Sequence, residues 1–334
     1  MAERAAQIDT FLAACGWADA ARAPLPGDAS FRRYCRLTRG DTATMLMDAP
    51  PPQEDVRPYL AVARHLRTLD LSAPTILAAA EEAGLLLIED FGDGTFTRLL
   101  AQGEDEHALY AMAIDVLIAL HRRFDAAHAA WLPPYDDTRL LNEAALLLDW
   151  YLPAVTGQPT PAALREEYLD LWRALFPVAR GVPDSLVLRD YHVDNLMRLD
   201  ERDGIAACGL LDFQDAVLGP VTYDLVSLLE DSRRDIAPDL VSAMYARYHA
   251  AFPNVDRAAL DASYAVLGAQ RHCKVIGIFT RLCRRDGKPR YLAHIPRLWR
   301  LLGGNFRHPV LAPVKAWLDK HIPPEVRRIP AETP

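Results

Sequence analysis

No run of apolar residues in the sequence reaches the roughly 18 that a membrane-spanning helix needs. The first residues, MAERAAQIDTFLAACGW, carry charges where the apolar core of a secretory signal peptide would lie. Cysteine is also scarce. The chain has 5 cysteines and no CxxC pair, which predicts free thiols in a reducing compartment rather than a disulfide framework. We therefore expect a cytoplasmic protein without a membrane partner.

The chain also lacks an excess of positive charge. Its 37 Lys and Arg residues are outnumbered by 45 Asp and Glu, which gives a formal net charge of -8. Because nucleic-acid backbones are held by an excess of basic residues, this balance argues against a nucleic-acid partner. With 334 residues, 51% of them hydrophobic, the chain is long enough to form two lobes.

The hydrophobic pattern changes near residue 90. Before it, the sequence predicts a helix over 5–15, a hairpin over 28–48, a helix over 56–69, and strands near 76–79 and 85–88. Beyond it, helical periodicity predicts helices over 107–123, 142–152, 162–179, 221–231, 238–251, 258–282 and 291–302. Short strands are predicted within 184–215. The expected class is α+β, with a small nucleotide-covering lobe over 1–90 and a large, mainly helical lobe over 91–334.

Two segments carry residues suited to phosphoryl transfer, a reaction that requires positioning and charge neutralisation. The first is LRDYHVDN over 188–195, where an Asp precedes an Asn by five positions and both side chains can converge from one tight loop. Asp190 is the candidate base for an attacking hydroxyl, and Asn195 offers an oxygen to Mg²⁺. The apolar run that ends at Asp212 delivers a second carboxylate, the candidate bridge between Mg²⁺ and the nucleotide phosphates.

These segments resemble the motifs of the aminoglycoside phosphotransferase-like kinases, relatives of choline kinases and protein kinases. The first family motif reads HGDLHPGN, so Asp190, His192 and Asn195 align, whereas the leading His has no counterpart. The second resembles LIDWEDA, and LDFQDA over 211–216 matches it. The resemblance covers about residues 25–300. It implies a bilobal protein-kinase-like fold, with a small antiparallel-sheet lobe and a helical catalytic lobe, that uses ATP and Mg²⁺.

Further segments are similar to a bacterial branch of that family, the anomeric sugar kinases: GDASFRRY over 27–34, LMDAPP over 46–51, and IEDFG over 88–92. This resemblance implies phosphorylation of N-acetylmuramate and N-acetylglucosamine at the C1 hydroxyl during peptidoglycan recycling. The expected protein is a monomer whose partners are the sugar and the nucleotide. A kinase of another small acceptor, such as an aminoglycoside, choline or homoserine, is one alternative. A non-catalytic kinase-like binding protein is another.

The nucleotide side departs from the family pattern. The third strand has no Lys to hold the α and β phosphates, and the phosphate-covering loop lacks the usual glycines. Arg32 or Arg33 is the candidate replacement, because a guanidinium can bind phosphate through two hydrogen bonds. Ser30 adds a small residue to the same loop, and the resemblance implies a nucleotide-binding hinge at Glu89 and Phe91. The simpler interpretation of both arginines is a solvated turn.

Candidate contacts to the acceptor are polar residues close to these motifs or on a later helix: His192, Asp215, Glu230, Asp231, Arg271, Lys274 and Arg281. N-acetylmuramate carries a lactyl carboxylate, which requires a nearby cation, and the last three residues are candidates. The alternative is that they are surface charges on an amphipathic helix. For His192 the alternative is a structural loop residue. Asp224 is more consistent with a fold anchor at the start of a helix.

Overall fold

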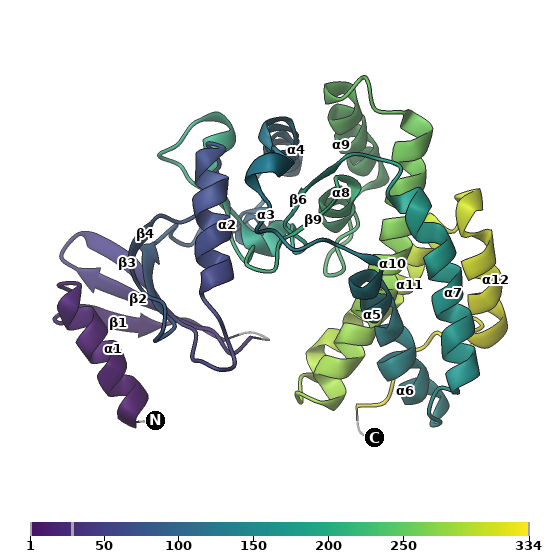
Figure 1. The fold of residues 1–334 in the computed structure, drawn as a ribbon, viewed down its shortest axis with the longest axis horizontal. Helices are drawn as coiled ribbons and strands as arrows, with labels where there is room; N and C mark the ends of the chain where they lie inside the picture. The colour runs from purple at the N-terminus through teal and green to yellow at the C-terminus, as the bar shows by residue number, and fades with distance from the viewer. Residues whose placement is uncertain (1, 28–29, 333–334) are drawn as a thin grey trace. The chain divides into compact units, whose positions relative to one another are not determined.

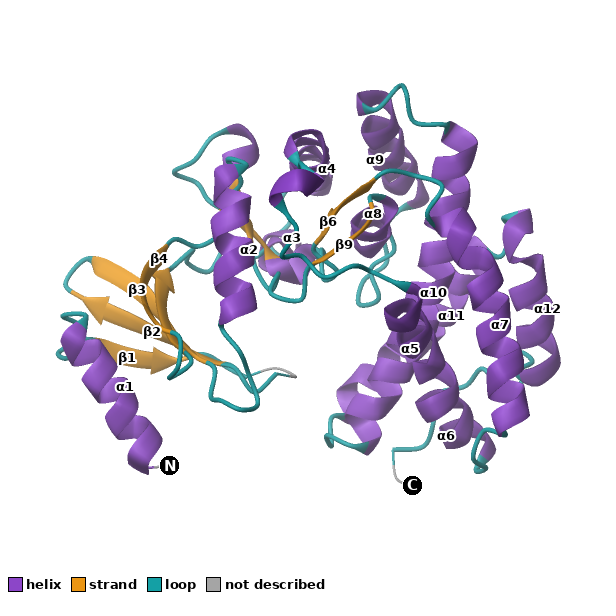
Figure 2. Cartoon of the chain, in the orientation of Figure 1, coloured by secondary structure: helices purple, strands orange, loops and turns teal. Residues whose placement is uncertain are grey.

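The computed structural model describes residues 2–27 and 30–332. The chain divides into two compact units, Met1–Arg123 with Val193–Ala216, and Phe124–His192 with Val217–Pro334. Asp28 and Ala29 of the predicted phosphate-covering loop lie outside the described residues. Figures 1 and 2 show the elements of both units. The lobe boundary at residue 90 stays a prediction.

The first unit is built on a five-stranded antiparallel sheet, which confirms the predicted small β-sheet region. The strand order is β1-β2-β3-β5-β4, and all neighbouring strands are antiparallel. The bounds are β1 Ala21–Pro24, β2 Arg33–Arg39, β3 Thr42–Asp48, β4 Ile76–Ala80 and β5 Leu85–Glu89. The pairing of β2 with β3 confirms the hairpin. The sequence pattern does not predict β1, because the strand has only 4 residues and all of them are exposed.

Helix α1, Ala2–Ala14, covers one face of this sheet (Figure 1). Phe11 and Leu12 of the helix form a buried cluster with Trp17, Ala20, Leu37, Leu46, Leu85 and Leu87. Leu85 and Leu87 are two residues apart, so they point to the same face of the sheet. The other helices of this unit are α2 Arg57–Thr68, α3 Phe96–Ala101 and α4 Glu106–Arg123.

A two-stranded antiparallel sheet completes the first unit. Its strands are β7 Leu196–Arg198 and β8 Cys208–Leu210, and Leu196 pairs with Leu210. Short 3₁₀ turns over Val193–Asn195 and Gly204–Ala207 precede the two strands. The predicted short strands within 184–215 are therefore confirmed.

The second unit is mainly helical, as predicted, and α10 lies at its centre. Helices α5, α7, α8 and α11 all pack against α10. The helices are α5 Asp137–Leu146, α6 Leu152–Thr156, α7 Ala162–Ala179, α8 Thr222–Leu229, α9 Pro238–Ala251, α10 Arg257–Arg284, α11 Ile295–Asn305 and α12 Ala312–His321, with a π-helical turn over Leu147–Tyr151. Two strands, β6 Asp184–Val187 and β9 Val217–Pro220, pair with each other.

The central position of α10 corrects one interpretation of its polar residues. Arg271 and Lys274 are 3% and 8% exposed, so the alternative of surface charges is wrong for these two residues. Arg281, nearer the end of the helix, is half-buried. Among the residues that the structure describes, no helix is both long and apolar enough to span a membrane.

Gly277 allows α10 to approach the end of α5 closely. A Cβ atom added here would lie 2.3 Å from the carbonyl carbon and oxygen of Leu146. Because these are backbone atoms, Gly277→Ala is expected to push the helices apart and to lower the free energy of unfolding by about 1–3 kcal/mol. Chemical denaturation measures this change.

Gly303→Ala in α11 is the matched control. Nothing lies within 4 Å of a Cβ atom added at this position, and an alanine is favoured over a glycine inside a helix by roughly 0.5–1 kcal/mol. The control should therefore be neutral or slightly stabilising. Equal losses of stability in the two variants would contradict the close approach.

Candidate active site

Asn195 and Asp212 lie at the same end of the β7–β8 sheet. Asn195 directly precedes β7, and its carbonyl accepts a hydrogen bond of 3.0 Å from the amide of Leu211. Asp212 follows at once, with a φ of 57° that turns the chain away from the strand. Its side chain is 40% exposed. The local backbone therefore brings the two predicted metal ligands to the same end of this two-stranded sheet in the first unit.

The donors at this turn fit Mg²⁺. The ion prefers oxygen ligands, and in nucleotide sites it is bound through one or two carboxylates plus substrate phosphates and water. Asp212 supplies a partly exposed carboxylate, and Asn195 supplies an amide oxygen. Asp215, which is exposed, lies next to the same turn and accepts a hydrogen bond from Gln214 at 3.3 Å.

Arg32 contacts this turn directly. Its Nη2 donates to the Asp212 carboxylate at 3.0 Å, and only 11% of the arginine side chain is exposed. Burial opposes the charge of Arg32, but Tyr34, Asp212, Glu54 and Asp215 outweigh burial and raise its pKa above the ordinary value. Arg32 is therefore a fixed cation beside the candidate metal ligand, and not a solvated turn residue.

Glu54 organises the loop that carries Arg32, a role that the sequence does not reveal. One of its carboxylate oxygens accepts hydrogen bonds from the Ser30 hydroxyl at 3.0 Å and from the Phe31 amide at 3.1 Å. The Ser30 hydroxyl in turn accepts from the Nε of Arg32 at 3.0 Å. Arg33, by contrast, is exposed at the start of β2. The structure thus favours Arg32 over Arg33 as the candidate phosphate ligand, a choice that the sequence alone does not make.

The predicted hinge is held by two other arginines. Glu89 at the end of β5 accepts hydrogen bonds from Thr75 and forms an ion pair with Arg202. The Arg202 guanidinium also lies 5.4 Å from the centre of the Phe91 ring. Asp90 between them pairs with Arg36 of β2. The side chains of Glu89 and Asp90 are therefore engaged in fixing the hinge.

In the second unit, Asp224 anchors the segment before Asp190. The segment 188–192, which carries the candidate base, follows β6. The Leu188 amide donates to the Asp224 carboxyl group at 2.6 Å, and the Arg189 amide donates to it at 2.9 Å. Asp224 is 1% exposed, at the start of α8. This geometry supports the interpretation of Asp224 as a fold anchor.

Asp190 itself is exposed, as a base that must meet a substrate requires. The surrounding protein disfavours its charge, but Lys274, His192, Arg189 and Arg271 more than compensate and hold its pKa below the ordinary value. The carboxylate is therefore ionised at neutral pH, which is the state that accepts a proton.

The predicted acceptor residues of this unit have different hydrogen-bond partners. Lys274 donates to Glu143 and Tyr223 at 2.9 and 3.1 Å, and Arg271 donates to Ser227 at 2.9 Å. Glu230 is paired with His272 at 2.6 Å. His192 lies 3.3 Å from a guanidinium nitrogen of Arg233, whose amide donates to the buried Asp231. The charges of Arg285 and Asp286 act on Arg281 near the end of α10.

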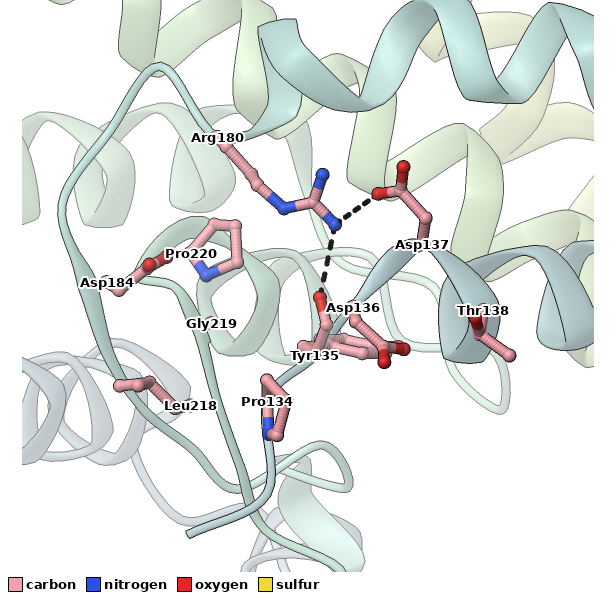
Figure 3. A pocket seen from close by; sticks show the side chains of 10 residues that line it. All are labelled: Pro134, Tyr135, Asp136, Asp137, Thr138, Arg180, Asp184, Leu218, Gly219 and Pro220. Carbon is pink, nitrogen blue, oxygen red and sulfur yellow. Dashed lines mark hydrogen bonds and ion pairs between the residues drawn. The ribbon is translucent and has the colours of Figure 1, made fainter. Parts of the chain in front are cut away.

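Two cavities of the second unit are lined by none of the predicted site residues. The first, of about 440 Å³, lies beside β9, where Arg180 pairs with Asp137 and donates to the Tyr135 carbonyl (Figure 3). The second, of about 720 Å³, adjoins the π-helical turn and includes Asp149 and Arg165. These cavities therefore add no residue to the candidate site.

Comparison with known proteins agrees with these motifs. The model of a family described as "Phosphotransferase enzyme family" matches residues 22–262. An N-acetylmuramate/N-acetylglucosamine kinase of Caulobacter vibrioides is 41% identical, over 98% of this chain and 99% of its own length. The protein of the same name from Pseudomonas aeruginosa is 39% identical, over 86% and 85%.

Solved structures share the fold at much lower identity. The choline kinase LicA from Streptococcus pneumoniae has a TM-score of 0.63 at 11% identity, covering 92% of this chain and all of that one. The GDP complex of aminoglycoside 2'-phosphotransferase-IIIa has a TM-score of 0.62 at 16% identity, covering 90% and 99%. These similarities confirm the predicted kinase-like α+β fold.

Asp224→Asn is expected to remove a pH dependence of stability. Burial raises the pKa of Asp224 to about 7 from an ordinary value of 3.8, although the two amides oppose this shift. The folded protein therefore keeps a proton that the unfolded chain loses between about pH 4 and pH 7. The contribution of Asp224 to stability is thus fully present below that range and is lost as the pH rises through it.

Urea denaturation between about pH 4 and pH 8 measures this effect. We expect the free energy of unfolding of the wild type, minus that of the variant, to fall up to about pH 7 and to stay constant above it. A difference that is flat, or that increases with pH, would contradict the raised pKa.

Proposed function

The chain belongs to the phosphotransferase enzyme family, and on that premise we propose that it transfers the γ-phosphoryl group of ATP to the C1 hydroxyl of N-acetylmuramate and N-acetylglucosamine. The observation that carries the proposal is the 41% identity to a kinase named for these two sugars over nearly the whole of both chains. Phosphorylation at C1 and a role in peptidoglycan recycling follow from the resemblance of the sequence motifs to the anomeric sugar kinases.

Asp190 is proposed as the catalytic base. Its ionised carboxylate accepts the proton of the sugar hydroxyl as the oxygen attacks the γ-phosphorus and the bond to the leaving ADP oxygen breaks. Because Lys274 and Arg271 favour its charged form, Asp190 is ready to orient the hydroxyl before transfer. Protonation of this carboxylate would remove both the acceptor for the hydrogen bond and the site for the proton.

Asn195 and Asp212 are proposed to hold Mg²⁺, which neutralises phosphate charge when it is bound. Arg32 is proposed as the cation that replaces the missing strand lysine, supported by its 3.0 Å contact with Asp212. Ser30, Glu89 and Phe91 stay predicted nucleotide contacts. The acceptor contacts proposed from the sequence are His192, Asp215, Glu230, Asp231, Arg271, Lys274 and Arg281.

Arg32→Ala tests the replacement of the lysine. A lost charge-assisted hydrogen bond is worth about 1.5–3 kcal/mol, so ADP binding measured by calorimetry should weaken by about tenfold to a hundredfold. Arg33→Ala is the matched control, because Arg33 is the exposed neighbour. If Arg33→Ala weakens ADP binding more than Arg32→Ala does, Arg32 is not the phosphate ligand.

The activity is tested by incubating the wild type with ATP, Mg²⁺ and one acceptor at a time, followed by phosphorus NMR. The acceptors are N-acetylmuramate, N-acetylglucosamine, an aminoglycoside, choline and homoserine. We expect a sugar 1-phosphate from the first two. Transfer to another acceptor alone would replace the proposed substrate, and no transfer to any acceptor would favour a binding protein.

Asp190→Asn should lower turnover by about 10²–10⁴-fold, the scale for loss of a general base, without changing ADP affinity. Asp184→Asn is the control, because Asp184 lies in β6, shortly before Asp190 in the chain. This variant should keep full turnover. Turnover of Asp190→Asn within threefold of the wild type would exclude Asp190 as the base.

A further inference from the structure

Arg189, directly before the proposed base, has a backbone conformation that residues with a side chain rarely adopt. Its φ is 70°, in the left-handed region. The main chain around it is held on both sides. The Leu188 and Arg189 amides donate to Asp224, and the Ser227 hydroxyl donates to the Arg189 carbonyl at 3.2 Å. Such strained residues persist where the surrounding structure holds them, which is frequently at functional sites.

The side chain of Arg189 ends in a buried cluster. Its Nη2 donates to the carboxylate of Glu143 in α5, a residue that is 8% exposed. Lys274 of α10 donates to the same carboxylate oxygen at 2.9 Å. The Tyr135 hydroxyl donates to the other oxygen, and the side-chain amide of Gln270 lies 3.4 Å from it. One carboxylate therefore connects α5 and α10 to the catalytic segment.

Two cations of this cluster pair with the same carboxylate. Arg189 and Lys274 are two cations that share the single negative charge of Glu143. Because a buried charge without a counter-ion is costly, a further negative charge close to them is favoured. Asp190 supplies it, since both Lys274 and Arg189 favour its ionised form.

We propose that Glu143 is a positioning residue for the reaction: through Arg189 it fixes the direction of the Asp190 carboxylate. Through Lys274 it also holds a cation that stabilises the charge of that carboxylate. The inference rests on the proposed role of Asp190 as the base. Glu143 lies outside every motif that points to the reaction, and it acts without touching the substrate.

Arg189→Met is the first test. It breaks the link to Glu143 but leaves Glu143 and Lys274 as a balanced ion pair, so the fold should survive. We expect kcat with N-acetylglucosamine to fall by about tenfold to a hundredfold, the scale of a small misplacement of a catalytic group, while ADP affinity stays unchanged. Hydrogen–deuterium exchange of a peptide that spans residues 186–192 should become faster.

Arg165→Met is the matched control for this variant. Arg165 forms a partly exposed ion pair with Asp149 at 3.0 Å, and both residues border the second cavity, which is lined by none of the predicted site residues. Loss of such a pair has little effect on stability. The control should change neither kcat nor the exchange of residues 186–192.

Glu143→Gln separates positioning from a general loss of structure. If Glu143 acts through Arg189, the substitution lowers kcat more in the wild-type background than in Arg189→Met, where only its contact with Lys274 is left to lose. Lys274→Met should move the acid limb of the kcat/KM profile to higher pH. The charged groups that act on Asp190 are Lys274, His192, Arg189, Arg271 and Asp224, and removal of the first cation raises the pKa of the carboxylate.

Two results would overturn the proposal: Arg189→Met with kcat within threefold of the wild type, or equal losses from Glu143→Gln in both backgrounds. If Glu143→Gln does not fold, Arg189→Met and Lys274→Met still test the positioning role. A wild type that phosphorylates neither sugar rejects the proposed function. In that case unchanged exchange of residues 186–192 in Arg189→Met rejects the positioning role separately.

Discussion

A carboxylate removed from water must recover its lost solvation from donors and cations of the protein, and this requirement organises the second unit. Glu143 obtains donors from Arg189, Lys274 and Tyr135, while Asp224 obtains the amides of Leu188 and Arg189. Three helices and the segment before Asp190 meet at these two groups. The partners of two buried carboxyl groups, those of Glu143 and Asp224, therefore set the location of the proposed base.

Arg32 of the first unit also pairs with a carboxylate, but this ion pair is more exposed to solvent than that of Glu143. Arg32 pairs with an Asp212 side chain that is 40% exposed, whereas the side chains of Glu143 and Lys274 are both 10% exposed. Partly exposed pairs contribute little to stability, so Asp212 can exchange its partner at small cost. A buried pair cannot, because separation leaves uncompensated charge. The ion pair of Arg32 with Asp212 can therefore be replaced by contacts with a ligand. The buried ion pair of Glu143 with Lys274 is suited to a constant structural role.

Periodicity predicted much of this fold because it depends on residues close in sequence. The β2–β3 hairpin and the helices α2, α7 and α9 follow from apolar spacing and turn residues. The motif residues Asn195 and Asp212 could also be chosen from the sequence, and the β7–β8 register explains why they lie at the same end of that sheet. The burial of Lys274 could not be predicted, because its partner Glu143 is 131 residues away in the chain. A charged residue on an amphipathic helix was the available signal, and it does not distinguish a buried ion pair from a surface charge.

Backbone strain carries information that the sequence pattern hides. Among residues 2–27 and 30–332, the non-glycine residues with positive φ are Asp70, Arg189 and Asp212, and the last two belong to the proposed site. The family motif HGDLHPGN has a glycine at the position of Arg189, and glycine adopts this conformation without strain. The backbone strain of an arginine at this position lowers stability unless favourable contacts of its side chain offset it. The ion pair of Arg189 with Glu143 is such a contact. It also connects the residue next to the proposed base to the buried core of the second unit.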